Sequence, residues 1–162
     1  MAFALKSPHI EHGKPIGVEH AFDGWGGNGK NVSPALEWSD PPEGTQSFAL
    51  MVHDPDAPTG SGWWHWIVYD IPADVRSLPA GAGSTARNLL PRGAREGRND
   101  YGFAGYGGPC PPPGPAHRYF FRLHALKVPK LDVPADATAA AIGFNVNANT
   151  IAVAELMGTY AR

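Results

Sequence analysis

The sequence predicts a mainly β protein with one or two short helices near its C-terminus. Glycine and proline number 20 and 17 among the 162 residues, which is typical of a chain with many turns and ordered loops. The apolar runs between these turns have the length of strands, and helical spacing occurs only late in the chain. No repeat, linker or low-complexity tract divides the sequence, so we expect a single domain over residues 1–162.

The predicted strands are short apolar segments bounded by turn residues. The first covers residues 36–38, and the next two, 48–53 and 66–71, stop where prolines follow. In the last, 119–126, every second side chain falls on one face, beginning with Tyr119. Strands of this kind predict sheets with one or both faces buried.

Two segments have helical character. Residues 134–142 are rich in alanine, and residues 150–160 carry Ile151, Ala154 and Met157 at helical spacing. Strands are therefore expected to dominate, with the helices confined to the C-terminal part.

Composition and charge exclude several classes of function. The formal net charge is −2 and no run of Lys or Arg occurs, which argues against a nucleic-acid partner. No apolar stretch approaches the roughly 20 residues that span a bilayer, and the N-terminus lacks the features of a signal peptide. Cys110 is the single cysteine, so folding needs no intrachain disulfide. We expect a cytoplasmic protein without a transmembrane segment.

Two aspartates and two histidines are the first candidate site residues. Asp54 and Asp56 are two residues apart, so in an extended segment both side chains would point the same way. Adjacent carboxylates repel unless a cation or a shared proton lies between them, and His65 and His117 are the candidate cations. We expect Asp54 to accept from loop amides and Asp56 to face the pocket.

The segment around His117 adds a phenol and a flexible backbone. His117 and Tyr119 are two residues apart and share one strand face. Gly107 and Gly108 allow the main chain to approach a ligand, and their N–H groups can donate to an anion. The combination predicts a small polar pocket for phosphate, acetate or a phosphorylated headgroup.

Some of these candidate site residues also have a purely structural interpretation. His65 is either a ligand-facing group or a buried histidine held by Asp54 or Asp56. The tryptophans of segment 63–66 either pack the core and the pocket rim, which we favour, or present indole faces to a sugar or an amine. Arg118 is expected on the opposite strand face, in an ion pair with an acid.

Four motifs stand out at residues 31–38 (NVSPALEW), 54–58 (DPDAP), 64–66 (WHW) and 107–119 (GGPCPP to HRY). In combination they resemble the phosphatidylethanolamine-binding protein family. The GPCPP form resembles its bacterial branch, often labelled Raf kinase inhibitor-like. The resemblance covers about residues 20–160.

The resemblance implies a β-sandwich of antiparallel sheets with a small anion pocket near one end. Cys110 stands where some members have glycine, so its backbone N–H is expected to matter more than its thiol. Asn149 stands where many bacterial relatives have histidine, which leaves the role of that position open. No cofactor and no bound metal are implied. Carried over by position, the ligand-binding residues are Asp54, Asp56, His65, Gly108, Cys110, Pro111, Pro112, His117 and Tyr119.

Three functions follow, and the first is favoured. The first is a small-ligand binding protein whose partner is an anionic or phosphorylated molecule and which catalyses nothing. The second is an inhibitor that docks a kinase or hydrolase over the pocket. The third is an enzyme, with either a Cys110 thiol nucleophile or a metal held by Asp54, Asp56, His65 and His117. A homodimer is one arrangement that would cover exposed edge strands.

Overall fold

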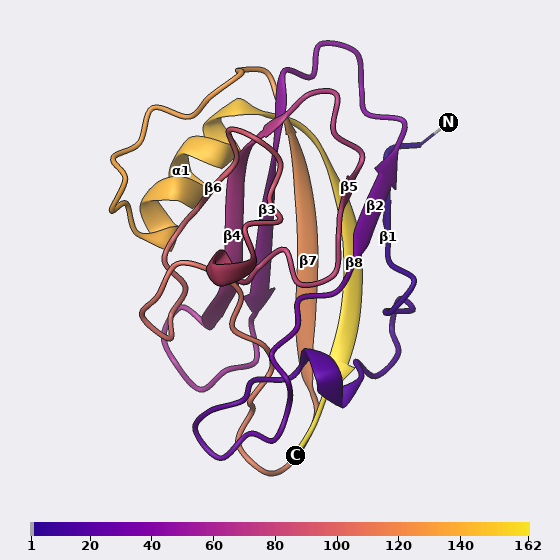
Figure 1. Ribbon diagram of the computed structural model, residues 1–162, viewed down its shortest axis with the longest axis vertical. Helices are drawn as coiled ribbons and strands as arrows, with labels where there is room; N and C mark the ends of the chain where they lie inside the picture. The colour runs from indigo at the N-terminus through magenta and orange to yellow at the C-terminus, as the bar shows by residue number, and fades with distance from the viewer. Residues whose placement is uncertain (1) are drawn as a thin grey trace.

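Two antiparallel sheets and one α-helix form the regular structure of this protein (Figure 1). The computed structural model describes residues 2–162. The larger sheet consists of β3 (Ser47–Asp54), β4 (Trp63–Pro72), β6 (Arg95–Glu96), β7 (His117–Leu126) and β8 (Thr150–Tyr160), in the order β6-β4-β3-β7-β8. The smaller sheet has the order β1-β2-β5, with β1 (Ala4–Lys6), β2 (Leu36–Ser39) and β5 (Ser77–Leu78). The helices are α1 (Ala139–Asn149) and the short 3₁₀ turns η1 (Val18–His20) and η2 (Thr85–Arg87).

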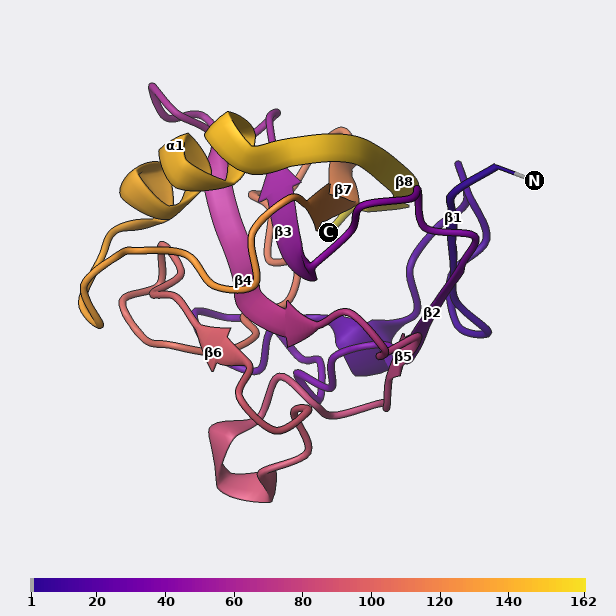
Figure 2. The ribbon, with the colours of Figure 1, turned by 90° about the horizontal axis from the view of Figure 1, so that it is seen from above.

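Side chains alternate across β3, and both of its faces are buried. Phe48, Leu50 and Val52 point between the two sheets and form the sandwich core with residues of the smaller sheet. Met51 lies in a second core on the opposite face, together with Ile142 of α1. Figure 2 shows α1 against the larger sheet, at a distance from β1 and β2. The molecule is therefore a β-sandwich with one helix on its outer face, which confirms the predicted fold class.

All four predicted strands are present. Each observed strand contains the predicted segment or overlaps it closely: β2, β3, β4 and β7 correspond to 36–38, 48–53, 66–71 and 119–126. In β7, Tyr119, Phe121, Leu123 and Ala125 enter the sandwich core, as the alternation predicts. Hydrophobic spacing was sufficient to predict these four strands because each strand buries at least one face.

The helix predictions need correction. The first helix begins and ends later than predicted, at Ala139–Asn149 instead of 134–142, with Thr138 as its N-cap. The predicted helix over 150–160 is wrong, because this segment is strand β8 and pairs with β7 along its length. β-branched residues begin the segment, and Ala154 and Leu156 bury one face at strand spacing.

β4 contains a β-bulge at the position of a candidate site residue. Val52 pairs with Trp66 and His53 pairs with Trp64, so His65 is an extra residue on β4. A bulge of this kind changes the direction of the side chains beyond it. Trp63 therefore lies opposite Asp54 in the register of the two strands.

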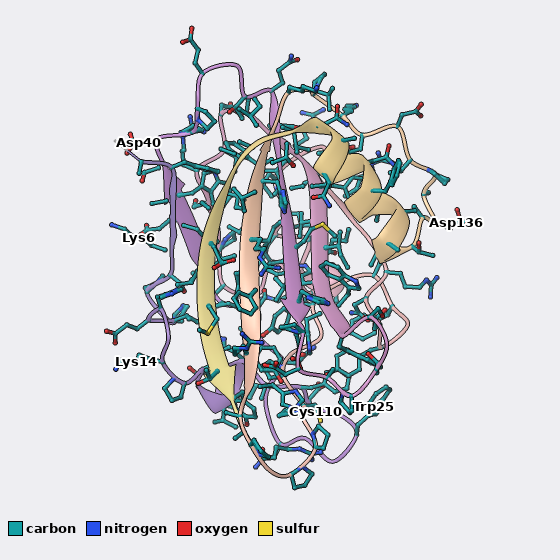
Figure 3. The ribbon with its side chains drawn as sticks, turned by 180° about the vertical axis from the view of Figure 1, so that it is seen from behind. Lys6, Lys14, Trp25, Asp40, Cys110 and Asp136 are labelled. Carbon is teal, nitrogen blue, oxygen red and sulfur yellow. The ribbon has the colours of Figure 1, made fainter. Side chains whose placement is uncertain are left out.

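The candidate residues gather at one end of the larger sheet. β3 ends there, β4 and β7 begin there, and β8 returns to the same end (Figure 1). Figure 3 shows Trp25 and Cys110 together at this end, on the two loops that cover it. The strand ends therefore provide a fixed frame, and the loops close it.

Candidate functional site

A cavity of about 180 Å³ lies at this end of the larger sheet. Seven of the nine predicted residues line it: Asp54, His65, Cys110, Pro111, Pro112, His117 and Tyr119. The six lining residues that the sequence did not single out as ligand-binding are Trp25, Ala57, Pro58, Thr59, Trp63 and Tyr101. Asp56 and Gly108 are not among the lining residues, and their positions are described below.

Asp54 and His117 form a hydrogen-bonded pair at the cavity. Asp54 is buried, and its Oδ2 lies 2.7 Å from His117 Nδ1. Its other oxygen, Oδ1, accepts the backbone N–H of Asp56 at 2.8 Å. A carboxylate can only accept, so His117 Nδ1 carries a proton and the ring orientation is fixed. The Nε2 atom of His117 has no hydrogen-bond partner in the part of the chain that the structure describes.

Asp54 accepts a loop amide as expected, but it is Asp54 and not Asp56 that lines the cavity. Asp56 follows the end of β3 in a turn, so strand parity does not apply to it, and its carboxylate binds Arg118. Arg118 donates from Nε at 2.9 Å, from Nη2 at 2.8 Å and from its backbone N at 2.9 Å. Hydrogen bonds from Arg118 lower the pKa of Asp56 to about 2. Each aspartate therefore has its own side-chain partner, and Asp54 is the carboxylate at the cavity.

His65 is a neutral imidazole with a defined tautomer. Its Nδ1 lies 2.6 Å from the carbonyl oxygen of Gly107, and a carbonyl only accepts. Burial lowers the pKa of His65 to about 4, so Nε2 carries no proton near neutral pH. The expectation that His65 acts as a cation is therefore wrong, and its partner is a backbone carbonyl instead of an aspartate.

Two buried donors of the cavity lining lack protein partners. The Tyr119 hydroxyl and the Trp63 Nε1 are both buried, and neither has a hydrogen-bond partner among the residues the structure describes. Burial raises the pKa of Tyr119, and the neighbouring Asp54 carboxylate raises it further, so the phenol keeps its proton. Unpaired buried donors are costly, and they are commonly explained by a missing water or ligand.

The two glycines hold a loop instead of presenting amides to the cavity. Gly107 N donates to the His65 carbonyl at 2.9 Å, and Gly108 N donates to Asn31 Oδ1 at 2.7 Å. A Cβ on Gly108 would lie 2.1 Å from the His20 carbonyl oxygen, so only glycine allows the loop to pack this closely. The prediction that these N–H groups donate to an anion is wrong, because both are already bonded.

Cys110 lies at the cavity, but its thiol contacts backbone carbonyls. Its Sγ is 3.8 Å from the carbonyl oxygens of Gly24 and Trp25, and no imidazole is among its hydrogen-bond partners in the described chain. The four-residue metal set is also not assembled, because Asp56 is bound to Arg118. Residues 2–162 contain no group of three or more His, Cys, Asp or Glu side chains placed to hold a metal.

Aromatic residues from distant segments form the cavity wall. Trp25 is 65% exposed and contacts Trp63 and Tyr101 edge-on, with ring centroids 5.9 and 4.9 Å apart. Tyr101 stacks on Phe22 at 3.9 Å, and its hydroxyl donates to the Gly108 carbonyl. No periodic pattern marks Trp25 or Tyr101, because both lie in loops that only tertiary packing brings together.

Comparison with known proteins decides the family. The family model described as phosphatidylethanolamine-binding protein matches residues 6–161. The chain belongs to the phosphatidylethanolamine-binding protein family. The predicted resemblance is therefore confirmed.

Relatives in this family are similar over nearly the whole chain. The UPF0098 protein YbhB of Escherichia coli is 45% identical over 156 residues, covering 96% of this chain and 98% of the relative. A crystal structure of Escherichia coli YbcL, described as a new member of the mammalian PEBP family, has a TM-score of 0.97 at 49% identity, covering 100% of this chain and 99% of YbcL. The PEBP homologue CT736 of Chlamydia trachomatis has a TM-score of 0.82 at 35% identity, with 99% and 98% covered.

The family relatives leave the cellular compartment open. A relative from Mycobacterium tuberculosis, 38% identical over 157 residues and covering 96% of this chain and 71% of the relative, bears the word lipoprotein in its name, LppC. Within residues 2–162, no helix is both long and apolar enough to cross a membrane. A cytoplasmic location stays a prediction.

Proposed function

We propose that this protein binds a small anion, phosphate or a phosphorylated headgroup, in the cavity between Asp54, His117 and Tyr119, and catalyses no reaction. The observation that carries the proposal is the set of polar hydrogens on the cavity lining. The Tyr119 hydroxyl and the Trp63 Nε1 are buried donors without protein partners. His117 adds a third donor, Nε2–H, when the ring is protonated on both nitrogens.

Asp54 provides a counter-charge for His117 when that ring is protonated on both nitrogens. Its Oδ2 accepts from His117 Nδ1, so the positive imidazolium has a buried counter-charge on the side away from the ligand. His65 contributes shape instead of charge, because it is neutral and its ring packs edge-on against Tyr119 at 5.1 Å. His117 is therefore the histidine that we propose as the cation facing the ligand.

The size of the cavity limits the ligand class. Its volume of about 180 Å³ equals roughly six water molecules in the liquid and is below the 300–1,000 Å³ common for drug-sized ligands. A phosphate with a short substituent fits these dimensions, whereas a lipid acyl chain does not. We therefore propose headgroup-sized ligands.

Binding is favoured over catalysis because no activated nucleophile is recognisable at the cavity. The Cys110 thiol contacts two carbonyl oxygens, whereas an activated thiol needs a base within hydrogen-bond reach. An inhibitory role toward a kinase or hydrolase, and a homodimer, stay predictions from the family resemblance.

Isothermal titration calorimetry with inorganic phosphate and phosphoethanolamine tests the proposal. We expect saturable binding to the wild type and at least tenfold weaker binding to His117→Ala, because that variant lacks the facing cation. His9→Ala is the matched control, since His9 is exposed and lies outside the cavity. Acetate in a parallel titration shows whether a carboxylate suffices.

Two results would contradict the proposed anion site. Absence of binding for both phosphate compounds, or equal affinity of wild type and His117→Ala, would remove the anion site. A parallel urea unfolding curve shows that each variant is folded at the titration temperature.

A further inference from the structure

A further cavity lies beside β6 and shares no lining residue with the first. Its volume is about 190 Å³, close to that of the anion pocket. Leu89, Leu90 and Ala82 provide an apolar wall, and Ser84, Asn88 and Glu96 provide polar groups. The cavity is formed by the segments on both sides of η2 and by β6.

Glu96 is the single charged residue of this cavity lining. Its Oε2 accepts from the Trp66 indole Nε1 at 2.7 Å, and Trp66 itself is fully buried. This bond holds the carboxyl group against the sandwich core. The other oxygen, Oε1, has no hydrogen-bond partner among the described side chains and backbone groups.

No cationic side chain neutralises Glu96 within the described part of the chain. Its strand neighbour Arg95 pairs with Asp70 at 2.8 Å and donates to the Leu131 carbonyl. Arg98, two residues further, donates to the Gly102 carbonyl. Burial raises the pKa of Glu96 to about 7, which reflects the cost of an uncompensated carboxylate in this position.

An uncompensated carboxylate beside an apolar wall defines the chemistry of a complementary ligand. A positive group with N–H donors would pair with Glu96 Oε1, and a short alkyl chain would cover Leu89 and Leu90. We propose that this cavity binds a small primary alkylammonium ion, with its ammonium group on Glu96 and its carbon chain on the two leucines. The site is independent of the anion pocket.

The volume sets the length of the ligand. A cavity of about 190 Å³ corresponds to roughly six water-sized groups, which suits an ammonium group with about four carbons. A ligand of this size gains limited binding energy, so we expect millimolar dissociation constants, on the order of 4 kcal/mol of binding free energy.

Titration with n-butylammonium chloride, followed by ¹H–¹⁵N NMR, tests the site directly. The indole Nε1–H of Trp66 is hydrogen-bonded to Glu96, so its resonance reports on that carboxylate. We expect a saturable shift of this resonance with n-butylammonium and none with 1-butanol, which has the same chain without the charge. This readout does not depend on the anion pocket, so it holds whether or not phosphate binds.

Two variants make the test specific. Glu96→Gln keeps an acceptor for Trp66 and is expected to weaken binding at least tenfold. Glu155→Gln removes an exposed carboxylate that pairs with Arg122 on β7, and is expected to leave binding unchanged. The proposal is overturned by the lack of a saturable shift, by equal affinity of Glu96→Gln, or by an equal response to 1-butanol.

Discussion

Tyr119 is the residue at which the proposed binding role has a cost in stability. Its ring is buried in the sandwich core, and its hydroxyl, which lies near the Asp54 carboxylate, makes no hydrogen bond of normal geometry within the described residues. A buried polar group without a partner costs about 1–3 kcal/mol. Such a cost is expected where a ligand supplies the missing bond.

Tyr119→Phe is therefore expected to separate the effect of the hydroxyl on stability from its effect on phosphate affinity. We expect the free energy of unfolding to stay unchanged or to rise by about 1 kcal/mol, because an unpaired hydroxyl is removed. Phosphate affinity is expected to fall about tenfold, which corresponds to one lost hydrogen bond of about 1.4 kcal/mol. Urea unfolding and calorimetry measure the two quantities; a less stable variant with unchanged affinity would show that the hydroxyl is structural.

At Gly108, the loop that covers the cavity lies directly against the backbone of His20. Gly108→Ala places a Cβ 2.1 Å from the His20 carbonyl oxygen, and backbone atoms cannot move away without shifting the loop. We expect a loss of about 2 kcal/mol or more in the free energy of unfolding. Gly60→Ala is the control, because a Cβ there meets nothing within 4 Å. Equal stability of the two variants in thermal unfolding would contradict this account of the loop.

At the scale of elements, the junction between α1 and β8 depends on one threonine. The Thr150 hydroxyl donates to the Val146 carbonyl at 2.7 Å and accepts from His124 Nδ1 at 3.0 Å. Burial lowers the pKa of His124 to about 4, so the imidazole is neutral and needs this acceptor. The threonine thus joins the last turn of α1 to β7.

Thr150→Val keeps the shape of this side chain and removes its hydrogen bonds. We expect a loss of about 1–3 kcal/mol in the free energy of unfolding, because the His124 N–H is left without a partner. Thr159→Val on the same strand is the control, since no hydrogen bond of its hydroxyl occurs within the described residues. Urea unfolding that shows the same loss in both variants would contradict the role given to Thr150.

For the molecule as a whole, two buried histidines and the partly buried Glu96 contribute to the dependence of stability on pH. His65 and His124 have pKa values lowered from 6.5 to about 4, so the unfolded chain takes up their protons first. Their contribution is complete above pH 6.5 and is lost as the pH falls toward 4. Glu96 has a pKa raised from 4.5 to about 7, so its contribution is complete below pH 4.5 and is lost as the pH rises through 7.

Two histidines therefore oppose one glutamate between pH 5 and 6.5. We expect the free energy of unfolding to rise with pH in this window by roughly 1 kcal/mol per pH unit, the value for one net proton with allowance for partial exposure. Glu96→Gln removes the opposing group, so its slope is expected to be about twice as steep. Urea unfolding at a series of pH values measures both slopes, and a slope that falls with pH in the wild type would contradict these assignments.

Sequence patterns predicted the parts of the molecule that depend on local spacing. Alternation in β7 placed His117 and Tyr119 on one face, and both line the same cavity. The bulge at His65 and the turn that directs Asp56 to Arg118 were not predictable, because they depend on pairing between strands. The segment that forms β8 was predicted as a helix from its local spacing. Its partner strand, β7, is distant in sequence, so local spacing does not reveal the pairing.

The cavity wall was missed for the same reason. Trp25 and Tyr101 reach the site only because hydrogen bonds at Gly108 and Asn31 hold two loops together. No periodicity marks residues that a tertiary contact brings together. The family resemblance supplied most of the residues that line the cavity, and the structure places Asp54 at the cavity and Asp56 on Arg118.

The central claim is that His117 is the cation that meets an anion, while His65 stays neutral. Long-range ¹H–¹⁵N NMR of the imidazole rings during a phosphate titration tests this most directly. We predict that phosphate shifts the His117 Nε2 resonance toward the protonated, hydrogen-bonded form and leaves His65 as the Nδ1–H tautomer. An unchanged His117 resonance at saturating phosphate, or protonation of His65 Nε2 instead, would contradict the account.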